Sequence, residues 1–200
     1  MTMIRADGIG SLSFRGVARA LGVKPPSLYW HFESKEELLI QLQLLSLRTA
    51  GASMLERADA WEAHQKTAKQ RVLARLLGFI DGMMVMPADH REVLSVSGGS
   101  RQWLSDAGAA QLGPHLLTFL SAPRDTIAKA TASGAIKDGD ADARTVRLWL
   151  IVQGGLAVPK FHRSVPNMPH PAEQILPAAR DLLRGWGAST RVLNAIERPD

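Results

Sequence analysis

Apolar side chains recur along this chain with the three- and four-residue spacing of amphipathic helices, and the alternation typical of strands is nearly absent. The first helix is predicted over residues 13–21, and Gly22 follows it in the position of a glycine that ends a helix. Pro25 and Pro26 are tolerated in a first helical turn, so they predict the start of a second, short helix. From these segments onward the pattern indicates an all-α protein.

A longer helix is predicted to begin at Ser34, because Ser34 and Glu37 have the spacing of a capping box. Its leucines lie on more than one side, as in a helix wedged between other elements. The stretch 50–60 is poorer in apolar residues and suggests a joint, that is, a break between two helices. A strongly amphipathic helix is then expected over residues 61–86, and Pro87 ends it.

The second half of the chain is interrupted more often. Glycines and prolines within residues 88–121 predict only short helices there. A further helix is expected over residues 123–134, with its proline in the first turn. Two long helices are predicted at 145–158 and 172–185, and the proline-rich segment 159–171 between them is expected to be a loop.

Composition narrows the class of protein. Apolar residues make up 46% and charged residues 22% of the 200 residues, which is typical of a globular chain. There is no cysteine, so disulfides, cysteine-ligated zinc, iron–sulfur clusters and cysteine nucleophiles are excluded. The apolar runs are far shorter than the roughly 18 residues of a spanning helix, and the first residues lack the layout of a signal peptide. We therefore expect a cytoplasmic protein with no membrane partner.

The segment 13–32 has the layout of a helix-turn-helix, two helices around a turn that contains glycine. The net charge of +5 is too small to identify a partner, but part of the excess falls on and just before this segment. The amides at the start of the second helix can face phosphates or base edges. By spacing alone, a simple helical hairpin remains an alternative. Four basic residues stand here against Asp7: Arg5, Arg15, Arg19 and Lys24.

A longer motif is more specific. It consists of Gly22-Val23, then Leu28-Tyr29-Trp30-His31-Phe32, followed by Lys35 and Leu38. This string resembles the motif of the TetR (tetracycline-repressor) family of dimeric transcriptional regulators. The resemblance is close over residues 8–42, and beyond them it extends only to the helical pattern and the length.

The resemblance implies a DNA-reading role for the exposed side of this motif. Ser13 and Arg15 would contact a phosphate and a base edge, and Lys35 would hold a phosphate. Phe14 and Pro25 stand where the family often has polar residues, and the Phe14 ring could contact a thymine or simply pack. Tyr29 is equally open to a phosphate contact or to packing alone. The expected DNA-binding residues are Ser13, Arg15, Lys24, Pro25, Pro26, Ser27, Tyr29, Trp30, His31 and Lys35, and the expected core residues are Val17, Ala18, Leu21, Val23 and Leu28.

The resemblance also implies two domains. Residues 1–47 would form the helix-turn-helix domain, and residues 48–200 the domain that binds an effector and dimerises. The family usually carries a whole helix before the motif, whereas residues 1–7 here leave room for a stub, a truncated helix or a start that lies further upstream. We expect weak DNA binding, or none, unless such upstream residues exist. The last two predicted helices would form a four-helix bundle in a homodimer, since their apolar faces would otherwise be exposed.

An effector site is expected in the larger domain, in a mostly apolar pocket with few polar groups. Methionine suits such pockets because its side chain is unbranched and polarizable. Most apolar residues in such a set are more often ordinary core residues. The candidates are Phe79, Met83, Met84, His90, Trp103, His115, Phe119, Trp149 and Gln153.

No motif in the sequence indicates a cofactor, and the six histidines lack the spacing of metal ligands. No constellation of catalytic residues is apparent, so we do not expect an enzyme. The function expected is a ligand-responsive repressor, with operator DNA, a small-molecule effector and a second copy of the chain as partners. The alternative is a helical dimer that binds a small molecule and has impaired or lost DNA binding.

Overall fold

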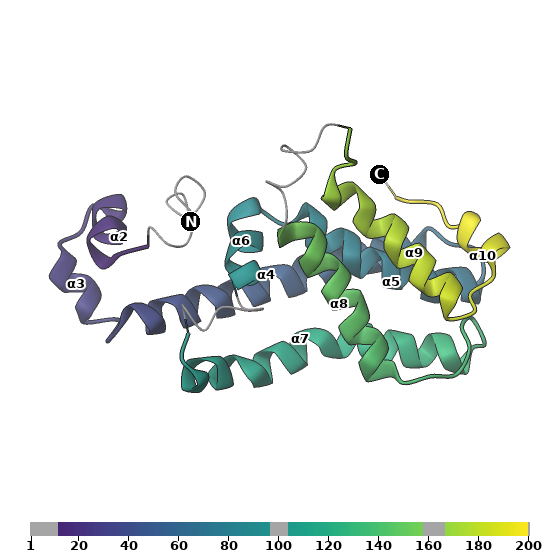
Figure 1. Cartoon of the computed structure of the whole chain (residues 1–200), viewed down its shortest axis with the longest axis horizontal. Helices are drawn as coiled ribbons and strands as arrows, with labels where there is room; N and C mark the ends of the chain where they lie inside the picture. Colours follow the sequence, from purple (N-terminus) through teal and green to yellow (C-terminus); the bar gives the residue numbers. More distant parts are fainter. Residues whose placement is uncertain (1–11, 97–103, 158–166, 200) are drawn as a thin grey trace. The chain divides into compact units, whose positions relative to one another are not determined.

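The computed structural model describes residues 12–96, 104–157 and 167–199 (Figure 1). Every regular element in these ranges is a helix, which confirms the all-α prediction. The elements are α2 (Phe14–Leu21), α3 (Pro25–Tyr29), α4 (Lys35–Ala63), α5 (Ala68–Val85), α6 (Ala88–Val96), α7 (Asp106–Ala132), α8 (Ala141–Ala157), the 3-10 helix η3 (Pro171–Gln174), α9 (Ile175–Gly185) and α10 (Thr190–Asn194).

The chain forms two compact units. Unit 1 consists of Met1–Thr49 and Met86–Thr118, and unit 2 consists of Ala50–Val85 and Phe119–Asp200. Helices α4 and α7 each begin in unit 1 and end in unit 2. The helix-turn-helix therefore shares its unit with α6 and the first part of α7, and the division of function at residue 47 stays a prediction.

The helix-turn-helix forms as its local sequence dictates. Ser13 has an extended backbone, and its hydroxyl accepts a hydrogen bond from the Gly16 amide at 3.2 Å, which caps α2. Gly22 ends α2 with a φ of 70°, a left-handed conformation that favours glycine. Helix α3 begins with Pro25 and Pro26. The predicted end of the first helix at Leu21 and the predicted start of the second at Pro25 are confirmed.

The core of unit 1 joins the helix-turn-helix to the start of α4 and to α6. Ala18 and Leu28 are buried as predicted, but Leu21 and Val23 are exposed, so their prediction as core residues was wrong. The contacts of α2 with this core lie at Phe14 and Val17, before the last turn of the helix. The buried cluster consists of Leu12, Leu38, Leu39 and Val93, with Phe14, Val17, Phe32, Leu42 and Leu104 packed against it.

The first turns of α4 and α7 are joined by hydrogen bonds. Ser34 caps α4 by accepting from the Glu37 amide at 3.0 Å, while the Glu37 carboxylate accepts from the Glu33 amide at 2.6 Å. The predicted capping box is confirmed. Its second hydrogen bond, from a backbone amide to the Glu37 carboxylate, comes from Glu33 and not from Ser34. Glu36 accepts from both the hydroxyl and the amide of Ser105, and these bonds lower the pKa of the Glu36 carboxyl.

Helix α4 continues through residues 50–60, so the predicted joint was wrong. The small residues there allow a close approach to α5. A Cβ atom added at Gly78 would lie 2.6 Å from the Ala58 Cα, and one added at Gly82 would lie 2.5 Å from the Met54 Cα. The scarcity of large apolar side chains thus reflects two backbones in contact, which only glycine on α5 permits.

A buried carboxylate stabilises the same pair of helices. Asp81 on α5 is fully buried and accepts hydrogen bonds from Arg57 at 2.8 Å and from the Trp61 indole at 3.0 Å. Arg198, near the end of the chain, donates to its other oxygen at 2.7 Å. A buried charge is tolerated only when it is paired and hydrogen-bonded, and here three donors meet that condition.

Helix α7 differs most from the sequence prediction. It runs unbroken from Asp106 to Ala132 through both Pro114 and Pro123, where short helices and a new start were expected. Phe119, Pro123 and Ile127 are buried at a spacing of four residues. Burial of this stripe offsets the hydrogen bonds that the prolines cannot make.

The boundaries of the other helices differ less from those predicted. Helix α5 begins at Ala68, because residues 61–63 complete α4, and α8 begins at Ala141. The segment predicted at 172–185 is divided between η3 and α9. By length and mean hydropathy α4 could also cross a membrane, but 44% of its most apolar window is buried within the protein. We therefore describe α4 as a core helix.

The contact between α4 and α5 predicts that Gly82→Ala destabilises the protein. The added methyl group meets backbone atoms that cannot move aside, and overpacking of this kind costs roughly 1–3 kcal/mol of unfolding free energy. Gly113→Ala in α7 is the control, because its Cβ meets nothing within 4 Å; it is expected to stabilise by up to about 1 kcal/mol through helix propensity. Chemical denaturation measures both, and a Gly82→Ala protein as stable as Gly113→Ala would contradict the prediction.

Candidate functional site

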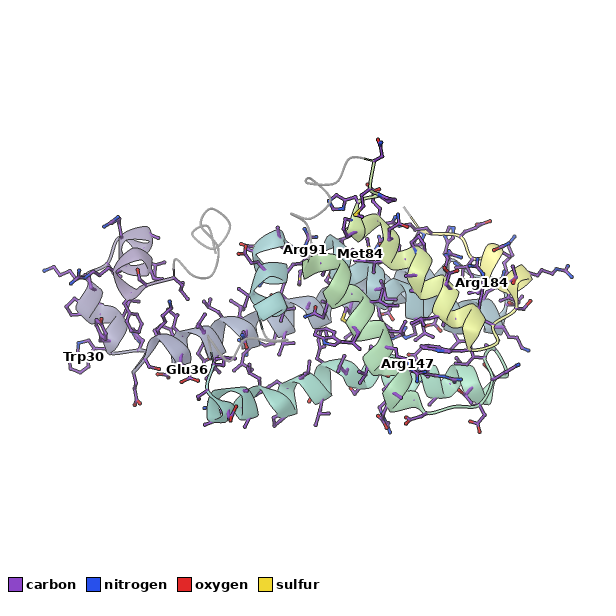
Figure 2. All side chains as sticks on the ribbon, in the orientation of Figure 1. Trp30, Glu36, Met84, Arg91, Arg147 and Arg184 are labelled. Atoms are coloured by element: carbon purple, nitrogen blue, oxygen red, sulfur yellow. The ribbon has the colours of Figure 1, made fainter. Side chains whose placement is uncertain are left out.

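The residues predicted to bind DNA lie on α2, on α3 and at the start of α4. Nine of them are exposed, and Pro25 is half-buried. Tyr29 is 59% exposed and Trp30 is 89% exposed. Figure 2 shows Trp30 projecting outward from the end of α3. Two large aromatic side chains, one at the end of α3 and one directly after it, are thus available for contact with a partner.

The part of this surface that α2, α3 and the turn between them form carries positive charge and no acidic residue. Arg15, Arg19 and Lys24 are exposed, and residues 12–32 contain no aspartate or glutamate. Lys35 adds a further exposed cation at the start of α4. Such a surface attracts polyanions through the phosphate charges that dominate nucleic-acid affinity.

Phe14 supports the exposed aromatic ring of Tyr29. The two ring centroids are 4.6 Å apart with an interplanar angle of 58°. Phe14 also packs against the buried cluster of unit 1, so it connects Tyr29 to the core. Of the two interpretations left open for Phe14, packing is therefore the one observed. The pairing could not be predicted from the sequence pattern, since the two residues lie on different helices.

A second candidate site is a cavity inside unit 2. It has a volume of about 30 Å³ and lies among α4, α5, α7 and α8. The rings of Phe119 and Trp149 meet edge to face across α7 and α8, with centroids 5.5 Å apart. The described residues that line it are Met54, Leu76, Phe79, Ile80, Met83, Phe119, Leu120, Pro123, Thr145, Leu148, Trp149 and Val152.

Four of the nine predicted effector residues meet at this cavity: Phe79, Met83, Phe119 and Trp149. Met84 and Gln153 belong to the same unit but are not among the described lining residues.

The other three predicted residues lie elsewhere. His90 and His115 belong to unit 1, where the Nδ1 atom of His90 lies 3.0 Å from the Ser46 hydroxyl and His115 is exposed. Trp103 lies outside the described residues.

The remaining lining residues were missed, although the sequence contains a usable signal. The positions 76, 79, 80 and 83 on α5 have the spacing of one helical face, and so do 145, 148, 149 and 152 on α8. The predicted effector residues are aromatic, methionine and polar residues, chosen by type. Selecting whole faces would have found the aliphatic walls as well.

Unit 2 also has an open polar groove of about 510 Å³ on its surface. Arg71, Arg75 and Lys129 contribute positive charge to it, and Glu62 contributes one negative charge. Arg75 is already paired, with Asp59 at 2.5 Å and Glu62 at 2.7 Å. Among the described residues there is no cluster of acidic and histidine side chains that could hold a metal ion.

The contact of Phe14 with Tyr29 predicts an energetic coupling between the two rings. In a double-mutant cycle with Phe14→Leu and Tyr29→Leu, we expect a coupling of about 0.5–1.5 kcal/mol in the free energy of unfolding. The matched cycle of Phe14→Leu with Trp30→Leu should be additive, because Trp30 is almost fully exposed. Urea denaturation measures both cycles, and equal coupling in the two would contradict the assignment.

Comparison with known proteins gives a match for the N-terminal segment. Residues 1–42 match the profile of the family described as "Bacterial regulatory proteins, tetR family". The tetracycline repressor protein class G of Vibrio anguillarum is 31% identical over 86 residues, which cover 42% of this chain and 41% of that protein. The class D repressor of Escherichia coli is 29% identical, with 42% and 39% covered. The chain thus spans about 40% of the length of these curated relatives.

Solved structures share the fold over nearly the whole chain. The TetR family transcriptional regulator PfmR from Thermus thermophilus is 17% identical with a TM-score of 0.62, over 94% of this chain and 96% of that chain. A bacterial regulatory protein in the tetR family from Rhodococcus RHA1 is also 17% identical, with a TM-score of 0.66 over 94% and 93%. At this identity the likeness establishes the fold alone.

Proposed function

We propose that this chain, a TetR-family protein by its helix-turn-helix segment and its fold, is a transcriptional repressor that releases operator DNA when a small molecule binds in its C-terminal part. The observation that carries the proposal is the exposed, basic surface of α2 and α3, which bears the family motif. A cytoplasmic location accords with this function. No arrangement of catalytic groups among the described residues supports an enzyme.

In this proposal α3 enters the major groove of the DNA. Its exposed Tyr29 and Trp30 would contact the groove wall, and His31 would lie beside a phosphate. Arg15 at the start of α2 would read a base edge, because the guanidinium of arginine forms two hydrogen bonds with guanine. Lys24 and Lys35 would neutralise phosphates and so fix the position of the protein.

A second copy of the chain is part of the proposal. On α8, Val146 and Leu150 are 48% and 61% exposed, four residues apart on one face. Packing α8 and α9 against the same helices of a partner would bury this face in a four-helix bundle. The two recognition helices of the dimer would then reach major grooves about 34–36 Å apart.

The release of DNA would act through α4. Met54 lines the cavity, and the same helix begins at Lys35, next to the recognition helix. A ligand that changes the packing around Met54 would thereby favour a different arrangement of α4. It can lower the affinity for DNA only by the ratio of its own affinities for the two states.

Two substitutions separate base reading from phosphate binding. Arg15→Ala should weaken binding to an operator selected from a random duplex pool by about 5- to 150-fold, with a smaller effect on random DNA, because about 1–3 kcal/mol of discrimination is lost. Lys35→Ala should weaken both alike and reduce the slope of log affinity against log salt by about 0.9. Mobility-shift titrations measure these effects, with Arg191→Ala on α10 as the control. Equal losses on both DNAs for Arg15→Ala would reject its role.

The dimer is tested separately. Leu150→Glu should convert the dimer to monomer at micromolar concentration, because it places a charge in the centre of the proposed apolar interface. Leu117→Glu is the control, since Leu117 is equally apolar and 73% exposed but lies on α7. Sedimentation velocity distinguishes the two species. A dimer that persists in Leu150→Glu and dissociates in Leu117→Glu would place the interface elsewhere.

A further inference from the structure

We infer that the cavity of unit 2 takes a neutral, apolar organic molecule and rejects charged ones, an inference that rests on the proposed effector role of this cavity. Carboxylates, phosphates and ammonium groups would thus be excluded as groups buried in the cavity.

The polar groups of the lining offer nothing to a charged ligand. None of the described lining residues is charged, and the wall that faces the cavity is apolar. Thr145 carries the one hydroxyl among them, and this hydroxyl already donates to the Ala141 carbonyl at 2.8 Å. The other donor among these side chains is the indole N–H of Trp149, and it does not contribute to the apolar wall that faces the cavity. A carboxylate can only accept hydrogen bonds, so it finds no donor on this wall. An anion in such a place would remain unpaired, which is strongly unfavourable. An ammonium group could face only the rings of Phe79, Phe119 and Trp149, and such a contact replaces only part of its lost hydration.

The polar side chains that were predicted to contact the effector do not change this conclusion. His90 and His115 belong to unit 1, and Gln153 is not among the described residues of the lining. Arg71 and Lys129 line the separate surface groove, so an anion that binds unit 2 has another place to bind. The two sites therefore differ in the charge of the ligand that each can hold.

The walls favour a ring-shaped apolar ligand. The edge-to-face pair of Phe119 and Trp149 presents ring edges and faces, and aromatic ligands pack well on such surfaces. Met54 and Met83 add thioethers, which adapt their shape and contact ring edges favourably.

The present volume of about 30 Å³ is far smaller than the roughly 300–1,000 Å³ of a typical ligand pocket, so the ligand must displace side chains. The wall formed by α5 is held against the α4 backbone at Gly78 and Gly82 and cannot yield easily. Leu120 and Trp149 are only half-buried. We therefore place the opening movement at these two side chains of α7 and α8.

The test compares three probes that share a naphthalene ring on the full chain: 2-methylnaphthalene, 2-naphthoate and 2-naphthylmethylammonium. Equilibrium dialysis should show the neutral probe bound at least about tenfold more tightly than either ion, since an unpaired buried group costs more than about 1.4 kcal/mol. Trp149→Ala should change the affinity for 2-methylnaphthalene at least threefold. Leu117→Ala, at an exposed position on α7 two residues before Phe119, should leave it unchanged.

Each outcome decides the inference. If 2-naphthoate binds, the double variant Arg71→Ala and Lys129→Ala should lose this binding and Trp149→Ala should retain it. That result supports the inference, because the anion then uses the groove. An ion that binds as tightly as 2-methylnaphthalene and depends on Trp149 overturns it, and so does the absence of binding by the neutral probe. Trp149→Phe replaces Trp149→Ala if the latter does not fold, with equilibrium dialysis again as its readout.

The outcome for the proposed function is read separately. Operator affinity is measured with and without saturating 2-methylnaphthalene. A probe that binds in the cavity without altering operator affinity leaves the ligand class intact and contradicts the switch. A probe that fails to bind, in a protein that binds operator, contradicts the ligand class and leaves the DNA-binding role intact.

Discussion

The close contact between α4 and α5 is the constraint on which unit 2 depends. Gly78 and Gly82 allow the two backbones to touch, and the buried carboxylate of Asp81 lies on α5 between these glycines. Its donors come from α4 and from Arg198, so one residue ties together segments that are distant in the sequence. The α5 side of the cavity is thereby fixed, and the positions of Phe79 and Met83 follow from it.

Local sequence predicted the helix-turn-helix well because its signals act over short distances. Ser13 caps α2 by accepting a hydrogen bond from the amide of Gly16, three residues further along. Gly22 supplies the left-handed turn, and Pro25 starts α3. Each of these effects requires no knowledge of the rest of the chain. The exposure of Leu21 and Val23 was not predictable in the same way, since it depends on which elements pack against α2.

Non-local packing explains the errors further along the chain. Pro123 suggested a helix start, yet it lies buried within α7, where its apolar ring contributes to the cavity wall. Residues 50–60 suggested a joint because small side chains also occur where helices touch. In the candidate effector site, residue type found the rings and Met83, whereas the aliphatic walls followed only from the helical faces observed in the structure.

The exposure of Trp30 has an optical consequence. An indole in water emits at longer wavelength than a buried one and is reached by a soluble quencher such as iodide. Trp30 is 89% exposed, whereas Trp61 and Trp186 are buried at 1% and 7%. The surface proposed to enter DNA therefore carries a natural fluorophore that is spectrally distinct from these two core tryptophans.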